Sequence, residues 1–385
     1  MGMGRVTHPA LRSFGHAFTR EVRNAWRKPV IHWLCWCFPL LLFALISSDF
    51  SEGSLLDLPV VAVDNDHSQL SHTLIRNLNA GSHASIRTFN GSLGAARAEM
   101  ESTGAYGLLW IPENFEAHTL AGKQPRVTFW YNALIFGAGF YSTQDFTGLV
   151  STLNQQYAIR LSAATGQVLP PAASVSMVYD SLFNASGSFV YYQQFGSVIH
   201  LTQLFVVTCM IFVLARSRPL IFQRHFVMAL LGKLLPYTLS FTTLLMVELA
   251  LLVGFFDARV VGNPLLMLLV ALCYVMAAQS LGLLLYSFTT SALYAYTFTG
   301  MFVGVALAFS GLAIPQLSMP LPAQIIAQLQ PLTHALAAMF DLFLRDVPAR
   351  PVFSVCGVLL LYPLAVALLL RRRLPQRLSR PEPPS

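Results

Sequence analysis

Long apolar runs are distributed unevenly along this chain. One run covers residues 30–47, a polar and mixed stretch covers 48–196, and apolar runs then continue almost without a break over 197–370. About 20 consecutive apolar residues are needed for a helix to cross a bilayer. The pattern therefore predicts one membrane span, a folded domain outside the membrane, and then a bundle of spans.

Within these runs the sequence predicts six transmembrane helices. They are expected near residues 30–47, 197–215, 236–256, 264–287, 291–314 and 352–370. They should be helices because every backbone polar group inside a bilayer must find its partner within the chain. The apolar segment 320–344 is interrupted by Pro322 and Pro331. We therefore expect it to lie on the outer surface or to re-enter the membrane rather than to span it.

The intervening stretch 48–196 has the pattern of an α/β domain. Strands are predicted at 58–64, 85–89, 106–111 and 127–131, with helical segments between them. Alternating strands and helices are typical of a sheet covered by helices. The predicted fold class is a polytopic α-helical membrane protein with about six transmembrane helices and an extracytoplasmic α/β domain between the first and second.

Composition and charge agree with a membrane protein. Hydrophobic residues make up 55% of the chain and charged residues only 11%, whereas soluble domains carry about 25% charged residues. The net charge of +7 does not indicate nucleic-acid binding, because the basic residues flank the spans. They gather before the first span, after the second and after the last, which places these three loops and both termini in the cytoplasm. The tail 371–385 is then cytoplasmic and 48–196 is extracytoplasmic.

Residues 1–29 predict an amphipathic helix on the cytoplasmic side of the membrane. Apolar residues recur every three or four positions, with arginines between them. The apolar positions are Leu11, Phe14, Phe18, Val22 and Trp26. Helices of this kind lie in the membrane interface. The alternative is a disordered basic tail, and the regular apolar stripe argues against it.

Few residues have the spacing of a catalytic or cofactor site. Gly232 and Lys233 are adjacent, but the first glycine and the Ser or Thr of a phosphate-binding loop are missing around them. ATP must then be bound by another polypeptide. All five cysteines lie in predicted spans, so no disulfide framework is implied.

A metal site is the one chemical alternative in the α/β domain. Asp64, Asp66, His67 and His72 are close in sequence. Turn and helix-cap roles explain the two aspartates better than metal binding does. We therefore predict no catalytic, cofactor or metal site in this chain.

Glu248 is the most unusual residue within the spans. It lies midway along the predicted third span, where a charge is costly and usually faces a cavity or a partner. One explanation is structural pairing with Gln279 or His200. The other is a role in gating or in substrate binding.

Small residues follow one face of the predicted fifth span. They are Gly300, Gly304, Ala308 and Gly311. Such a face allows two helices to approach closely. The partner helix could belong to the same chain or to a second chain across a dimer, and the sequence leaves both open.

Several short motifs, taken in order, resemble one transporter family. They are Leu58-Pro59-Val60-Val61-Ala62-Val63-Asp64, Phe183-Asn184, Gly232-Lys233-Leu234, Gly282-Leu283-Leu284 and Ser310-Gly311-Leu312-Ala313-Ile314-Pro315. Together with the layout of spans, they resemble the membrane (permease) subunit of type-2 ABC exporters, in the branch with a large periplasmic insert after the first transmembrane helix. The resemblance covers nearly the whole chain and depends on the order and spacing of the motifs.

The resemblance implies ATP-driven export. The chain would move an amphiphilic substrate, such as a drug, a lipid or a glycan-like molecule, out of the cytoplasm or the inner leaflet of a bacterial inner membrane. ATP and magnesium would bind to a partner ABC ATPase and not to this chain. The other expected partners are a second copy of the chain or a second permease, membrane lipids and, as a further candidate, a periplasmic adaptor protein.

One loop departs from the pattern of that family. The family carries an acidic Arg-Glu-x-Glu-x-Gly-Thr-x-Glu element after the second span, which helps to form the surface that couples to the ATPase. Here residues 215–225 are short and basic and lack its Glu, Gly and Thr. Coupling is then expected to run mainly through the N-terminal helix or through a second, intact permease. The alternative function is a degenerate, non-transporting scaffold or sensor that binds a periplasmic adaptor or pairs with an intact permease.

These interpretations define two sets of candidate residues. The candidates for coupling to the ATPase are Arg20, Glu21, Arg23, Arg27, Arg216, Arg218 and Arg224. The candidates for gating or dimer contact are Glu248, Gly300, Gly304 and Gly311.

Overall fold

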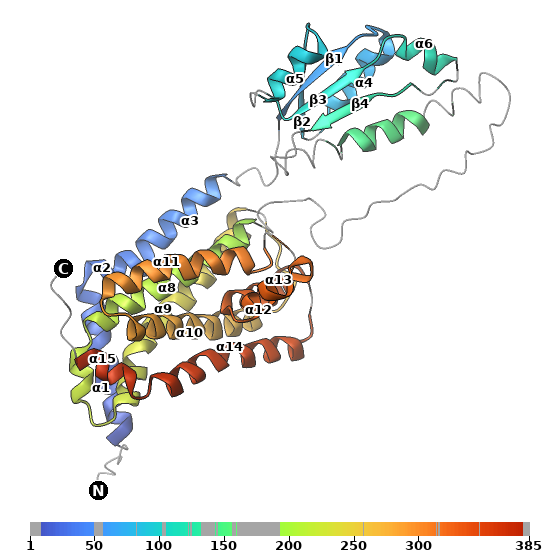
Figure 1. Ribbon diagram of the computed structural model, residues 1–385. Helices are drawn as coiled ribbons and strands as arrows, with labels where there is room; N and C mark the ends of the chain where they lie inside the picture. Colours follow the sequence, from blue (N-terminus) through green and yellow to red (C-terminus); the bar gives the residue numbers. More distant parts are fainter. Residues whose placement is uncertain are drawn as a thin grey trace. The chain divides into compact units, whose positions relative to one another are not determined.

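The computed structural model describes residues 9–49, 57–81, 83–101, 105–121, 123, 125–131, 143, 145–155, 159, 193–256, 258–312, 314, 316–345 and 347–379. The chain divides into two compact units, Met1–Gly53 together with Ser181–Ser385, and Ser54–Asp180. The first unit holds the long apolar helices and the second holds a β-sheet (Figure 1). Phe183 and Asn184, part of the motif series, lie outside the described residues.

The first unit is a bundle of apolar helices. Among the described residues, six helices are long and apolar enough to cross a membrane. They are Pro29–Ser48, α8 (Phe195–Ala215), α9 (Phe226–Phe255), α10 (Pro264–Phe288), α11 (Ala292–Phe309) and α14 (Ala349–Leu370). The first of them is built from α2 (Pro29–His32), a π-helical turn η1 (Trp33–Cys37) and α3 (Phe38–Asp49). Since the sheet lies between the first and second of these helices in the chain, the predicted α-helical fold with an inserted α/β domain is confirmed.

Helices α8 and α10 form the centre of the bundle. Most of their residues are buried, whereas most residues of α11 and α14 are exposed. Tyr274 of α10 is fully buried and donates a hydrogen bond to the Ile199 carbonyl oxygen of α8 at 2.9 Å. Phe195 of α8 stacks on Phe343 with ring centroids 4.2 Å apart. These contacts join the core helices without a charged group.

Two helix ends differ from the sequence prediction. Helix α9 begins at Phe226, ten residues before the predicted start at 236. Lys233 and Pro236 lower the apolar character of that first part, but both lie within the helix. Helix α11 ends at Phe309 rather than at 314, because Gly311 has a φ of +90°, which the right-handed helix cannot continue.

The segment that was predicted not to span the membrane forms two short helices. They are α12 (Leu321–Gln328) and α13 (Pro331–Leu344), and a 3-10 turn η4 (Gln316–Ser318) precedes them. Pro331 starts α13 in the first turn, where its missing N–H is not needed. Leu332, Ala335 and Met339 of α13 are fully or almost fully buried in the bundle core.

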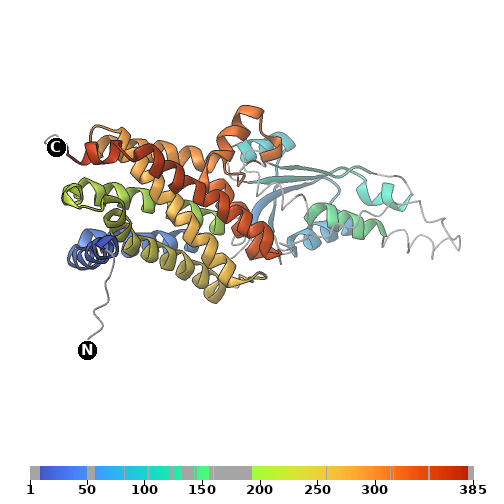
Figure 2. The same cartoon turned by 90° about the horizontal axis from the view of Figure 1, so that it is seen from below.

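Three helical elements outside the six spans gather at one end of the bundle. They are α1 (Pro9–Arg27), η3 (Arg218–Phe222) and α15 (Arg373–Ser379). Helices α12 and α13 lie toward the opposite end (Figures 1 and 2). The basic clusters that were predicted to share one side of the membrane therefore share one end of the bundle.

The second unit is a four-stranded sheet with helices on both faces. Its strands are β1 (Leu58–Asp64), β2 (Ala84–Thr88), β3 (Gly107–Ile111) and β4 (Thr128–Tyr131), in the order β2-β1-β3-β4. Strands β2, β1 and β3 are parallel and β4 is antiparallel to β3. Helix α4 (Gln69–Asn79) and helical residues 145–155 pack on one face and α5 (Leu93–Glu101) packs on the other. The middle of β1, Val60 to Val63, is apolar and buried because both of its faces are covered.

Candidate functional site

Helix α1 packs directly against the first half of α9. The contact is closest at Gly232, where a Cβ atom would overlap the carbonyl oxygen of Phe14. Only glycine allows the two backbones to approach to this distance. Helix packing therefore explains Gly232, the first residue of the Gly-Lys pair that resembled part of a phosphate-binding loop.

Lys233, the second residue of that pair, forms a buried ion pair with α1. Its Nζ donates to Oε2 of Glu21, and the Tyr237 hydroxyl donates to Oε1 of Glu21 at 2.7 Å. Lys233 and Tyr237 lie one helical turn apart on α9, so both reach the same carboxylate. Glu21 is only 6% exposed. We refer to Glu21, Lys233 and Tyr237 as the α1–α9 lock.

The lock fixes the position of α1 more than it adds net stability. Replacing a whole buried ion pair by apolar side chains is often neutral or stabilising, whereas removing one partner costs about 3–5 kcal/mol. The two donors on α9 match the two oxygens of one carboxylate on α1. One alignment of α1 along α9 satisfies all of these groups, and a shift by one residue would leave a buried charge unpaired.

A groove runs between α1 and the loop that follows α8. Its volume is about 80 Å³, and its lining includes Arg20 and Asn24 of α1 together with Arg216, Pro219 and Gln223 of the loop. Three predicted coupling residues from distant parts of the sequence, Arg20, Glu21 and Arg216, thus line one groove. Arg216 lies with its guanidinium 3.8 Å from the ring centre of Phe212.

The remaining coupling candidates lie elsewhere at this end of the bundle. Arg23 and Arg27 line a separate shallow groove on the other side of α1, beside Trp26. Arg224 is exposed in the loop before α9, and the side chain of Arg218 lies outside the described residues. Glu21, grouped with the coupling arginines from the sequence, belongs to the lock.

Three of the five residues in the apolar stripe of α1 are exposed, whereas Phe14 and Phe18 are half-buried. Leu11 is 57% exposed, Val22 is 42% exposed and Trp26 is 79% exposed. The inward face instead carries Glu21, whose charge is matched by Lys233. An exposed apolar stripe beside arginines suits a helix that lies in the membrane interface.

Helix α15 closes the same end of the bundle. Arg377 is buried, donates from Nε to the Thr289 carbonyl oxygen at 2.9 Å and lies 4.7 Å from the ring centre of Tyr286. Leu374 and Leu378 are also buried. The sequence analysis described this segment only as a basic tail. The spacing of four between the two leucines was the signal that could have revealed a docked helix.

The glycine face of α11 is open within this chain. A Cβ atom on Gly300 or Gly304 would meet no atom of the described residues within 4 Å. The buried face of α11 consists instead of Ala295, Thr299 and Val303, with Ala306. Packing through these two glycines is therefore not observed among the described residues. Gly311 has a different role, since its φ of +90° ends the helix.

Glu248 lies in the second half of α9 and not at its middle, because the helix begins earlier than predicted. It is 4% exposed and lines a small cavity with Gln194 and Thr202. Neither of the suggested pairings of Glu248, with Gln279 or with His200, is found among the described residues. Gln279 instead accepts a hydrogen bond from Thr238 at 2.9 Å.

Two thiols connect the first span to α8. Cys35 of η1 and Cys209 of α8 are buried free cysteines with Sγ atoms 3.7 Å apart. The π-helical turn therefore packs directly on a central helix of the bundle. Sequence analysis placed both cysteines in spans but had no means of pairing them.

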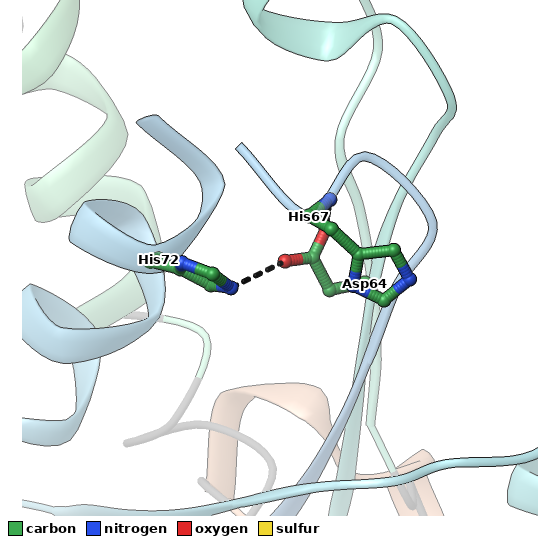
Figure 3. A group of neighbouring side chains, drawn as sticks. All are labelled: Asp64, His67 and His72. Carbon is green, nitrogen blue, oxygen red and sulfur yellow. Dashed lines mark hydrogen bonds and ion pairs between the residues drawn. The ribbon is translucent and has the colours of Figure 1, made fainter. Parts of the chain in front are cut away.

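In the sheet-containing unit, Asp64, His67 and His72 lie together (Figure 3). Their ligand atoms are all within 4.8 Å of one another. Oδ1 of Asp64 accepts the backbone N–H groups of Asp66 and His67 at 3.0 and 3.2 Å, and its Oδ2 accepts the Ser71 hydroxyl at 2.6 Å. These bonds account for the Asp64 carboxylate as a turn residue, as predicted, and the N-cap of α4 is Ser68.

Asp66 joins the same turn to α6 (Phe115–Leu120). Its carboxylate accepts the Glu116 backbone N–H at 3.0 Å. Partial burial raises the pKa of Asp66, but hydrogen bonds from Ser68 and from backbone N–H groups at the start of α6 lower it by more, so its net pKa lies below the ordinary value. Asp66 is therefore a structural carboxylate as well.

Comparison with known proteins identifies a family for this arrangement. The family model described as ABC-2 family transporter protein matches residues 30–371. No curated protein sequence matches the chain. The match begins at the first span and ends just after the last.

Proposed function

The chain belongs to the ABC-2 family of transporter proteins, and we propose that it is the membrane subunit of an ATP-driven exporter. Membership makes it a transport subunit that works with an ATPase and as a dimer in the general manner of the family. Our proposal adds the direction, which is out of the cytoplasm or inner leaflet of a bacterial inner membrane. It also adds a substrate class, which is an amphiphile such as a drug, lipid or glycan-like molecule.

The observation that carries the proposal is the α1–α9 lock. A permease needs an element on the ATPase side that is held firmly enough to transmit a displacement to the spans. Helix α1 has that property, because Glu21 is joined to Lys233 and Tyr237 within a helix of the bundle. The groove beside it carries Arg20 and Arg216, two cations that suit acidic groups on a partner.

The distribution of basic residues supports the orientation. Helix α1, η3 and α15 lie at one end of the bundle (Figure 1), and the basic residues near span ends mark the cytoplasmic side. We therefore place the ATPase at this end and both termini in the cytoplasm. The sheet-containing unit would then lie in the periplasm.

The exposed face of α11 supports a dimer. Gly300 and Gly304 face no described atom of their own chain, and small residues allow close contact between membrane helices. We propose that this face meets a second permease, either an identical copy or a related chain. Substrate would pass near the first, second and fifth spans.

The first test is to isolate the full chain from its native membranes and measure what accompanies it. A near-stoichiometric ATPase is expected, and Arg20→Glu with Arg216→Glu should reduce its recovery at least about tenfold, since two charge contacts are reversed. Arg350→Glu is the matched control, because Arg350 is exposed at the start of α14 and should leave recovery unchanged. Equal recovery with all variants would refute the placement of the ATPase.

A second function is favoured by one observation, the basic loop 215–225. If this loop no longer supports coupling, the chain is a scaffold or sensor that pairs with an intact permease or binds a periplasmic adaptor. Recovery of such proteins without any ATPase would support this reading over export.

A further inference from the structure

The cavity beside Glu248 holds a buried carboxyl group without a partner among the described residues. Glu248 is 4% exposed, and no hydrogen bond or ion pair to it is found among the residues that the structure describes. It lies seven residues before the end of α9, which is about 10 Å along the helix axis. A buried ionised group without a partner is costly in a membrane, and such groups usually mark a binding site or an ion pathway.

The other polar groups of this cavity offer unused acceptors. Gln194 donates from its Nε2 to the Ser47 hydroxyl oxygen. Its Oε1 is buried without a hydrogen-bond partner. The Thr202 hydroxyl donates to the Val198 carbonyl oxygen at 2.9 Å, so only its lone pairs remain. A group that supplies several N–H donors and a positive charge would satisfy this set.

The size of the cavity restricts that group. The cavity volume is about 10 Å³, which is space for the centre of one group the size of a water molecule. A primary ammonium is that small and carries three donors, whereas a guanidinium is larger and planar. The rest of the lining is apolar and includes Phe43 of the first span and Phe205 of α8, which suits an alkyl chain.

We propose that this cavity binds the primary ammonium group of a cationic amphiphile, with Glu248 as the counter-ion and Gln194 Oε1 and Thr202 Oγ1 as further acceptors. The inference rests on the proposed function, because it names the substrate class of that exporter. The ammonium donates its three N–H groups and remains protonated throughout, so no bond is made or broken. The ammonium group alone fills the cavity, whose volume is about 10 Å³, and the alkyl chain extends out of it into the membrane.

Binding to the purified full chain tests this proposal without requiring transport. The chain is placed in nanodiscs of zwitterionic lipid, and binding of radiolabelled decylammonium is measured. Decyltrimethylammonium, which has the charge but no N–H donors, and decanol, which has no charge, serve as competitors. Unlabelled decylammonium should displace the label, whereas the other two should be at least about tenfold weaker, the effect of losing hydrogen bonds to a charged group.

Two variants assign the binding to this cavity. Glu248→Gln should weaken decylammonium binding at least about tenfold and remove the preference for the primary amine. Asp341→Asn in α13 also removes one carboxylate, but one that pairs with Arg345, and it should bind like wild type. Gln194→Leu, which keeps Glu248, should weaken binding by a smaller factor and tests the site if Glu248→Gln does not fold.

The outcomes separate this inference from the proposed function. If the wild-type chain binds the three probes equally, or if Glu248→Gln binds decylammonium as wild type does, the ammonium site is refuted even when an ATPase accompanies the chain. If no ATPase accompanies the chain but the amine preference depends on Glu248, the site stands and export fails. Water alone in the cavity predicts no dependence on Glu248.

Discussion

Replacing Glu21 by Gln should release α1 from α9. The amide keeps the size of the carboxylate and an oxygen that accepts from Tyr237, so the change removes mainly the charge that faces Lys233. Two opposite unit charges in contact at about 3 Å attract each other by about 5 kcal/mol at an effective dielectric constant of 20. Lys233 would remain in the bundle with its side chain only 12% exposed.

The docking free energy that α1 loses in Glu21→Gln follows from these values. Breaking one partner of a buried pair costs about 3–5 kcal/mol. The lower value alone raises the undocked population about 150-fold, since every 1.4 kcal/mol is a factor of ten. Amide hydrogen exchange should therefore accelerate about 150-fold in residues 9–27, while amides in the middle of α10 keep their wild-type rates.

The assay is hydrogen exchange followed by mass spectrometry on the full chain in mild detergent. Arg23→Gln is the matched control, because it changes one exposed charge on the same helix and should leave exchange in α1 within a factor of about two, as surface substitutions do. The double variant Glu21→Leu with Lys233→Leu removes both charges and should exchange more slowly than Glu21→Gln. Unchanged exchange of α1 in Glu21→Gln would refute the lock.

Three further predictions follow from contacts described above. Gly232→Ala places a methyl group against the Phe14 carbonyl and should undock α1 as strongly as Glu21→Gln, measured by the same exchange experiment; wild-type exchange would contradict the close approach. Copper phenanthroline should join Cys35 to Cys209, whose Sγ atoms are 3.7 Å apart, in one chain, and Cys35→Ser should abolish the cross-link; linkage of Cys273 in its place would contradict the contact between η1 and α8. Asp66→Asn should destabilise the sheet-containing unit by about 1–2 kcal/mol at neutral pH, seen as faster exchange of the Glu116 amide. The folded-state pKa of Asp66 is lowered. Its contribution to the free energy of unfolding is therefore present above the unfolded pKa of about 4 and is lost as the pH falls through the folded pKa. A stability difference between wild type and Asp66→Asn that persisted below the folded pKa would contradict the assignment.

Sequence reasoning identified the spans because the bilayer restricts them strongly. A run of about 20 apolar residues has few structural alternatives when backbone groups cannot bond to water. The predicted start of α9 at 236 was wrong and left Lys233 outside the span. It lies within the helix because Glu21, which is 212 positions away, neutralises it. A prediction made from neighbouring residues in the sequence cannot detect a partner at that separation.

The candidate sites show the same division between local and distant information. Arg20 and Arg216 were selected separately for their charge, and only the fold shows that they line one groove. Gln194 was not selected at all, since one amide at a span boundary is unremarkable in sequence. Its importance comes from an unpartnered Oε1 in the cavity of Glu248. Arg377 was predicted only to belong to a basic cytoplasmic tail, because its acceptor, the Thr289 carbonyl, has no signature in the sequence.

Helix α9 links the two ends of the membrane bundle mechanically. Tyr237, held by α1, and Glu248, in the cavity, are eleven residues apart on one helix without an intervening glycine or proline. That distance is about 16 Å, and such a segment tilts as a rod. A tilt of about 5° at the end held by α1 would displace Glu248 by about 1.4 Å, roughly half the length of a hydrogen bond. A small movement of α1 would thus be enough to change which groups the Glu248 side chain can contact.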